Sequence, residues 1–237
     1  MILYNASTSA GLRNHARFLT NTNTTTFTDA DLDSAINTYY HQFVNNIVQS
    51  MDDWDFQGET ATADLVASQQ EYLFPTDILK IKRIEITYDG TNWNKVKMMD
   101  INKRSGATDS TTIGNEFNTE APFADLHDQS LFLYPIPTAA STAGLKIWYE
   151  KEATELSAAT SEPKFLEAYH KGLSYGAAID YFEKYSEVEG NTNKRNLAKQ
   201  NYNKIVEDME EFYQTRNQDR EYVIQPSFVD YDYGTNK

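Results

Sequence analysis

The sequence contains no cysteine among its 237 residues. This absence excludes disulfide bonds, cysteine nucleophiles and thiolate-bound metals, and it fits a reducing compartment. Long apolar runs are absent as well, so we expect no segment to cross a bilayer and no membrane partner. The first residues, Met1 to Tyr4, lack the basic start and the sustained apolar stretch of a signal peptide.

Basic residues are scarce: 21 Lys and Arg stand against 35 Asp and Glu, and the formal net charge is -14. Proteins that hold nucleic acid by its phosphates normally carry a basic patch, and the densest group here is only Lys80, Lys82 and Arg83. Specific DNA binding is therefore not expected. An acidic surface that faces DNA instead lets it pass without sticking, because like charges repel.

Catalytic motifs are lacking too. The four histidines (His15, His41, His127 and His170) are scattered, and none has a second ligand at metal-binding spacing. There is no glycine-rich phosphate loop, nucleophile elbow or HExxH motif, so we predict no catalytic residue, no metal site and no cofactor. Acidic pairs leave a two-carboxylate hydrolase open as an alternative. The pairs are Asp52/Asp53, Glu210/Glu211 and Asp230/Asp232.

Aromatic residues, by contrast, are plentiful. The chain is 40% hydrophobic and has 16 Tyr, a residue that suits interfaces because it buries a large ring and keeps a polar hydroxyl. Trp54, Trp93 and Trp148 allow a sugar-stacking platform. We expect them instead to be buried at the helix–sheet junction and in the sheet core, where large aromatics dominate packing.

Helical patterns flank the middle of the chain. Thr28 is placed to cap a helix over residues 28–50, and its first turns are rich in aspartate, which the helix dipole favours. Pro163 suits the first turn of a second helix, and Gly190 is placed to end it. Gly172 and Gly176 lie four residues apart, so another backbone can approach closely there.

The last predicted helix runs to Thr215, with Thr192 as its expected cap. Its apolar residues repeat at heptad-like spacing and its outer positions are charged. This pattern is typical of a helix that packs through one narrow apolar stripe, which we call the seam. We predict that this seam packs against a neighbouring subunit through Tyr202, Ile205, Met209 and Phe212.

Between these helices, residues 66–149 change to an alternating pattern. Strand-like segments follow one another, and Asp89-Gly90 is a strong hairpin signal. The pattern predicts a small antiparallel β-sandwich or partial barrel inserted into a helical bundle, an α+β fold. The expected strands are 71–74, 78–88, 93–99, 131–134 and 145–149.

Both ends of the chain differ from its body. Residues 1–27 are rich in Ser, Thr and Asn, which predicts a loosely ordered arm with a short helix around Leu12, Ala16 and Leu19. Residues 216–237 form an acidic, aromatic segment in which Pro226 blocks a helix. Either this segment folds back on the chain's own sheet or it docks on a partner as an extended arm. Its candidate contact residues are Tyr222, Val223, Ile224, Phe228, Val229, Tyr231 and Tyr233.

The order of the motifs resembles the head–tail adaptor (connector, or head-completion) proteins of tailed bacteriophages, especially of short-tailed phages. The resemblance covers residues 28–215. The motifs that carry it come in a fixed succession: Trp54-Asp55-Phe56, Gln70 to Ile78, Leu131 to Pro137, Trp148-Tyr149-Glu150, and Tyr175-Gly176-Ala177-Ala178.

This resemblance implies a non-enzymatic virion subunit, assembled in the bacterial cytoplasm. Such proteins form a ring, commonly of twelve copies, beneath the portal, which extends the DNA channel and carries the tail nozzle or tube. It implies that residues 216–237 contact the portal. The expected division is an arm (1–27), a bundle (28–60 and 160–215), a β domain (66–152) and a second arm (216–237). A carbohydrate- or fibre-binding module and an acidic cell-wall hydrolase are the alternatives.

Overall fold

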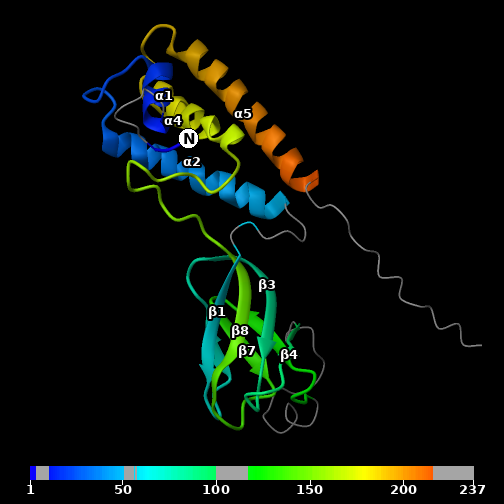
Figure 1. Cartoon of the computed structure of the whole chain (residues 1–237). Coiled ribbons are helices and arrows are strands. Elements are labelled where there is room, and N and C mark those ends of the chain that lie inside the picture. Colours follow the sequence, from blue (N-terminus) through cyan, green and yellow to red (C-terminus); the bar gives the residue numbers. More distant parts are fainter. Residues whose placement is uncertain (4–10, 51–55, 57, 100–116, 216–237) are drawn as a thin grey trace, which may run out of the picture.

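The structure, a computed structural model, describes residues 1–3, 11–50, 56, 58–99 and 117–215. The fold is α+β: a helical bundle lies at one end and a β domain at the other (Figure 1). In the part of the chain that is described, no helix combines the length and the apolar character needed to cross a membrane.

The bundle takes its helices from both ends of the described chain. Its members are α1 (Leu12–Thr20), α2 (Asp29–Ser50), α4 (Lys171–Lys184) and α5 (Asn191–Thr215), with a short 3-10 turn, η2 (Glu167–Tyr169), before α4. The strands between them are β1 (Gly58–Leu65), β2 (Glu71–Leu73), β3 (Ile78–Ile86), β4 (Asn94–Lys95), β5 (Lys97–Met98), β6 (Phe123–His127), β7 (Ser130–Tyr134) and β8 (Ser141–Lys151). The insertion predicted from the sequence is therefore confirmed.

Helix α2 begins as its sequence predicts. The Thr28 hydroxyl oxygen accepts a hydrogen bond from the Asp31 backbone N–H at 3.2 Å, and the same hydroxyl donates to the Asp31 carboxylate at 2.9 Å. This satisfies one of the free N–H groups of the first turn. Asp29 and Asp31 both lie in that turn, where the helix dipole favours negative charge.

Helix α1 belongs to the bundle, so the loosely ordered N-terminus expected from composition is not what residues 12–20 form. Leu12 and Ala16 are fully buried and lie in the core with residues of α2 and α4. The Arg17 guanidinium donates to the Asp29 carboxylate at 2.5 Å and to the Phe27 carbonyl oxygen at 2.8 Å. An arginine on the short helix thus holds the start of α2.

The glycine pair of α4 marks a close helix–helix contact, as its spacing predicts. A methyl group added at Gly172 would overlap the ring of Phe43, and one added at Gly176 would overlap the ring of Tyr39. Both aromatic residues lie on α2. The absence of a Cβ at these two positions therefore lets α2 lay its rings directly on the α4 backbone.

The predicted helix start at Pro163 is wrong, because α4 begins only at Lys171. Side chains of other helices take up the backbone groups of the segment before it: the Tyr40 hydroxyl accepts the Lys164 N–H, and the Tyr213 hydroxyl accepts the Leu166 N–H, both at 3.2 Å. These tertiary hydrogen bonds replace those of an early helical turn.

The break between the last two helices falls where the sequence places it. Gly190 has φ 86°, a left-handed conformation that glycine adopts without penalty. Helix α5 begins at the next residue, Asn191, so Gly190 holds the cap position and the cap expected at Thr192 is wrong by two residues. Asn191 is buried, and its side-chain amide donates to the Tyr185 carbonyl oxygen at 2.8 Å.

Two four-stranded sheets make up the β domain, in the orders β1-β8-β3-β4 and β2-β7-β6-β5. Every pair is antiparallel except β5 with β6. The domain begins one strand earlier than expected, because Gly58–Leu65 pairs with β8. The sequence analysis also missed β6. The Asp89-Gly90 hairpin between β3 and β4 is confirmed.

One short stretch belongs to both sheets. The predicted strand 93–99 is divided at Val96: β4 pairs with β3 in the first sheet, and β5 pairs with β6 in the second. The Val96 N–H donates to the Ile84 carbonyl oxygen and the Lys97 N–H to the Pro122 carbonyl oxygen, both at 2.9 Å. The sheets are thus joined at this corner without closing into a barrel.

Candidate interaction surfaces

The seam predicted on α5 packs inside its own chain. Met209 is fully buried, and Tyr202, Ile205 and Phe212 are partly buried against the bundle core. Burial raises the pKa of the Tyr202 hydroxyl to about 12, and the nearby carboxylates Glu210 and Asp180 act in the same direction. The buried residues of the seam pack against α2 and α4 of the same chain. That the seam also packs against a neighbouring subunit remains a prediction.

The predicted arm contacts lie outside the described residues. They are Tyr222, Val223, Ile224, Phe228, Val229, Tyr231 and Tyr233. The described chain ends at Thr215, at the end of α5 that faces the β domain (Figure 1). The last described residues of the chain therefore lie beside the junction of the two domains, where Tyr213 contacts Phe56.

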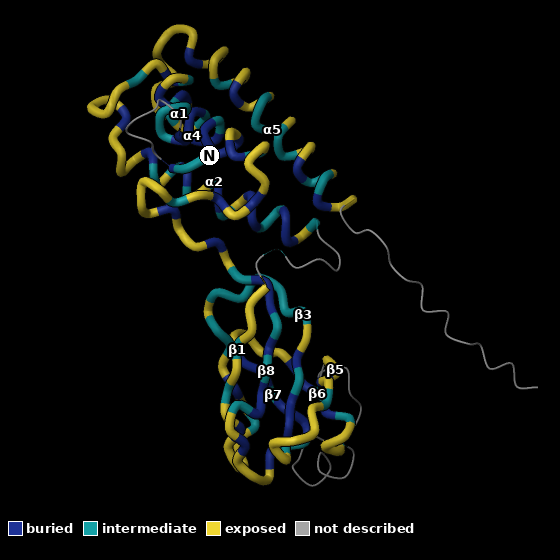
Figure 2. The backbone as a smooth tube through the Cα atoms, viewed as in Figure 1, coloured by how far each residue is buried: buried dark blue, intermediate teal, exposed yellow. Residues whose placement is uncertain are grey.

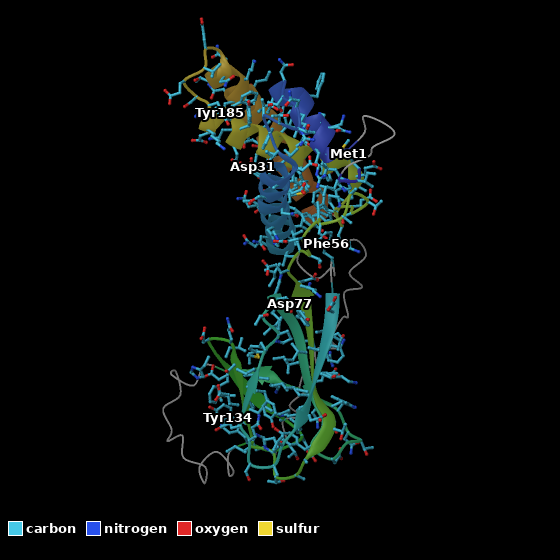
Figure 3. The ribbon with its side chains drawn as sticks, turned by 90° about the vertical axis from the view of Figure 1, so that its left-hand side faces the viewer. Met1, Asp31, Phe56, Asp77, Tyr134 and Tyr185 are labelled. Atoms are coloured by element: carbon cyan, nitrogen blue, oxygen red, sulfur yellow. The ribbon has the colours of Figure 1, made fainter. Side chains whose placement is uncertain are left out.

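A buried carboxylate fixes that junction. Glu150, near the end of β8, has no exposed surface, and its Oε1 accepts the backbone N–H of Phe56 at 3.2 Å. The Lys82 ammonium lies 3.8 Å from the same oxygen. The Phe56 ring in turn packs edge-on against the ring of Tyr213 on α5. Figure 3 shows Phe56 between the bundle and the β domain, with Asp77 at the adjacent end of the sheets.

The return connection from β8 to the bundle is also held by side chains. The Asn37 side-chain amide makes two hydrogen bonds with the backbone of Leu156, accepting its N–H at 2.8 Å and donating to its carbonyl oxygen at 3.3 Å. His41 Nδ1 lies 3.3 Å from a carboxylate oxygen of Glu152. Helix α2 therefore anchors the chain on its way out of the β domain.

A groove with a volume of about 810 Å³ opens on the side of the β domain. It lies between β3 of one sheet and β5 and the β6–β7 turn of the other, on the bundle-facing side of the corner at Val96. Its apolar lining includes Ile78 and Ile81, which are half-buried, and Met98 and Leu126, which are 49% and 43% exposed. An apolar groove that stays exposed on the surface of a protein commonly marks a binding site.

The groove is rimmed by basic side chains in an otherwise acidic protein. Four bases line it (Lys82, Arg83, Lys95 and Lys97) together with one acid, Asp128. Arg83 pairs with Glu85 at 2.5 Å. Within the described residues, Lys95 and Lys97 form no ion pair, and both are exposed (Figure 2 shows β5 and β6 at this edge). The groove therefore favours an anionic, partly apolar ligand.

The tryptophans do not all lie where the sequence analysis expected. Trp93 is 38% exposed, so its predicted burial is wrong, and the Lys146 ammonium lies 3.9 Å from its ring centroid. Trp148 is half-buried on β8, and Trp54 lies outside the described residues. One face of Trp93 is thus occupied by a cation, which leaves that face closed to a stacking sugar.

Two of the four histidines, His15 and His170, are packed inside the bundle. Nε2 of His170 lies 2.8 Å from the Phe165 carbonyl oxygen, its ring is buried, and burial lowers its pKa. Burial also lowers the pKa of His15. Among the described residues, no three His, Asp or Glu side chains are grouped as metal ligands would be.

The fold is that of an α+β protein, in which a helical bundle carries a β domain with an open, basic-rimmed groove. The model of the SU10 adaptor protein family matches residues 7–226. The chain therefore belongs to this family of phage head–tail adaptors, as its resemblance implied, and its role is that of a structural virion component. Comparison with curated proteins gives no match.

Proposed function

We propose that this adaptor assembles head to tail into a closed ring beneath the portal, where it extends the DNA channel and carries the tail nozzle or tube. The family match over residues 7–226 carries the proposal. The arrangement of the domains supports it, because a bundle at one end and a β domain at the other offer separate surfaces to a protein above and a protein below (Figure 1). Heterologous contacts between copies close into a ring when the rotation between neighbours fits.

The charge of the chain supports the channel role. With a net charge of -14, copies arranged around a lumen repel phosphates, so DNA slides through rather than binding. Twelve copies, the number common in such rings, remain part of the proposal. Electron microscopy of the protein on portal-bearing particles tests it: a closed ring at the portal vertex is expected, and a strict monomer on those particles would contradict it.

The arm is the proposed attachment to the portal, with Tyr222, Phe228 and Tyr231 as anchors. Large aromatic side chains in a polar segment supply contact area at low entropic cost. Deletion of residues 217–237 is expected to abolish docking on portal-bearing capsids while leaving the helical circular dichroism signal intact. Docking with undiminished affinity after this deletion would reject the arm's role.

A further inference from the structure

Helix α5 carries its charges in two blocks. Its first part, residues 191–204, contains four basic residues and no acidic one, and we call it the basic block. Its last part, residues 205–215, contains four acidic residues and no basic one, and we call it the acidic block. The charged residues in chain order are Lys194, Arg195, Lys199, Lys204, Glu207, Asp208, Glu210 and Glu211.

This order of charges works against the helix that carries it. The start of a helix favours negative charge and its end favours positive charge, yet the first turn of α5 has no acidic residue and its last turn has no basic one. Like charges also stand one helical turn apart, Arg195 with Lys199 and Glu207 with Glu211, where they repel each other. The stability of the helix therefore does not explain the two blocks.

Contacts within the chain do not explain them either. Arg195 lies 3.9 Å from a carboxylate oxygen of Glu183, and Glu210 accepts a hydrogen bond from the Asn46 side chain at 3.0 Å. The other charged side chains of α5 are exposed, and none of them forms an ion pair within the described residues. They are Lys194, Lys199, Lys204, Glu207, Asp208 and Glu211.

The exposed side of α5 is accessible to another protein. The helix packs on α4 and α2 and runs along the outside of the bundle (Figure 1). Exposed residues recur along its length (Figure 2). Leu197, two helical turns before Lys204 and therefore on the same side of the helix, is 61% exposed. This side thus offers apolar contact area beside its charges, as protein interfaces do.

The partner that the two blocks fit is α5 of a second copy. The basic block of one copy complements the acidic block of another when the two helices point the same way and are displaced along their axes. At 1.5 Å per residue this displacement is roughly 20 Å, half the length of the helix. The contact leaves one block of each helix unused, so a third copy can add in the same way, and the contact is heterologous.

We propose that, in the ring, the basic block of each α5 contacts the acidic block of α5 in the next copy. The inference rests on the proposed ring and deepens it, because it names a surface through which the copies meet. The contact uses the exposed side of α5, opposite the seam. It closes into a ring when the helices are inclined to the ring axis, since rotation alone then displaces neighbouring helices along their own lengths.

Charge reversal in the full-length chain tests this contact. One variant makes the basic block acidic, and the other makes the acidic block basic. We expect either variant alone to form at least about tenfold fewer closed rings on portal-bearing particles, because like charges then face each other. Electron microscopy counts the rings. The changes are Lys194→Glu, Lys199→Glu and Lys204→Glu in the first variant, and Glu207→Lys, Asp208→Lys and Glu211→Lys in the second.

A matched control places the same change in net charge outside α5. Its three positions are exposed, and the number of rings should stay that of the natural chain. The changes are Glu120→Lys, Glu155→Lys and Glu187→Lys.

Two combinations should restore the rings. A chain with all six α5 changes has its blocks exchanged and is again complementary to itself. A one-to-one mixture of the two single-block variants lets acidic copies alternate with basic ones. The exchanged charges agree with the helix dipole, so the six-change chain should melt no lower than the natural one, which separates assembly from folding.

The outcomes distinguish the contact from the ring. Rings of natural number in both single-block variants would overturn the α5 contact and leave the ring standing. If both variants lose the rings and neither combination restores them, the block charges meet a different partner and the proposal fails. Absence of rings from the natural chain would instead contradict the proposed function itself.

Discussion

The Glu150 carboxylate accepts a hydrogen bond from the Phe56 backbone N–H at 3.2 Å, and so ties the last strand of the β domain to the segment that follows α2. Glu150 has no exposed surface. Its Oε1 also lies 3.8 Å from the Lys82 ammonium. One side chain thus links the outgoing connection, the returning strand and the groove-lining strand β3.

Replacing Glu150 tests this link. Glu150→Ala removes the acceptor of the partly buried Phe56 N–H, and we expect a loss of about 1–3 kcal/mol in the free energy of unfolding. Small-angle scattering should show a wider distribution of domain orientations. The control is Glu155→Gln, whose side chain is exposed on the returning connection and whose effect should be near zero. An unchanged unfolding temperature in Glu150→Ala would mean that Glu150 does not stabilise the junction between the two domains.

The close contact of α2 with α4 predicts a steric effect. Gly176→Ala places a methyl group on the ring of Tyr39, and Gly172→Ala places one on the ring of Phe43. Each is expected to lower the free energy of unfolding by about 1–3 kcal/mol, because a packed core resists added volume. Chemical denaturation measures this. Lys199→Ala on the exposed face of α5 is the control, and an equal effect there would reject the steric cause.

The cap of α2 predicts a smaller effect. Thr28→Ala removes the hydroxyl that accepts the Asp31 N–H, and we expect a loss of about 1 kcal/mol. For a chain of this size that lowers the melting temperature by about 2–4 °C. Thr24→Ala, in the exposed turn before the helix, should leave it unchanged. Equal melting temperatures for the two variants would mean that the cap contributes nothing.

The contact between Arg17 and Asp29 predicts a pH dependence. The hydrogen bond from Arg17 lowers the pKa of the Asp29 carboxyl below its ordinary range. A lowered folded-state pKa stabilises the fold above the unfolded carboxyl's pKa, about 4, and this stabilisation is lost as the pH falls through the folded value. Asp29→Asn should therefore lower the melting temperature at pH 6 more than at pH 3. If Asp29→Asn lowered the melting temperature by the same amount at pH 6 and at pH 3, this charge effect would be excluded.

Local patterns predicted much of this fold. The cap at Thr28, the hairpin at Asp89-Gly90, the break at Gly190 and the close approach at Gly172 and Gly176 each depend on a few neighbouring residues, and the structure confirms them. The family resemblance also depended on local motifs, taken in order.

What the sequence did not reveal depends on contacts between distant residues. Pro163 suits a helix start, yet Tyr40 and Tyr213 bind the backbone after it in another conformation. The strand at 58–65 is polar and exposed along one side, so its alternation is weak, and its pairing with β8 comes from a segment about 80 residues away. Tyrosines expected at interfaces serve partly as hydrogen-bonding groups within the bundle.

The groove was missed for the same reason. Lys82 and Arg83 were recognised as a small basic group, but Lys95 and Lys97 join them only because the chain turns at Val96 from one sheet to the other. No sequence pattern marks how short β4 is, or that it pairs only with Glu85 and Ile86 of β3 before the chain crosses to the other sheet.

The β domain is attached through two antiparallel connections whose first paired residues are Gly58 and Glu150. The chain therefore enters and leaves the β domain at one end, the end that faces the bundle. In a circular assembly the opposite end of each β domain, where β3 turns into β4, would be the part of the chain farthest from the ring of bundles.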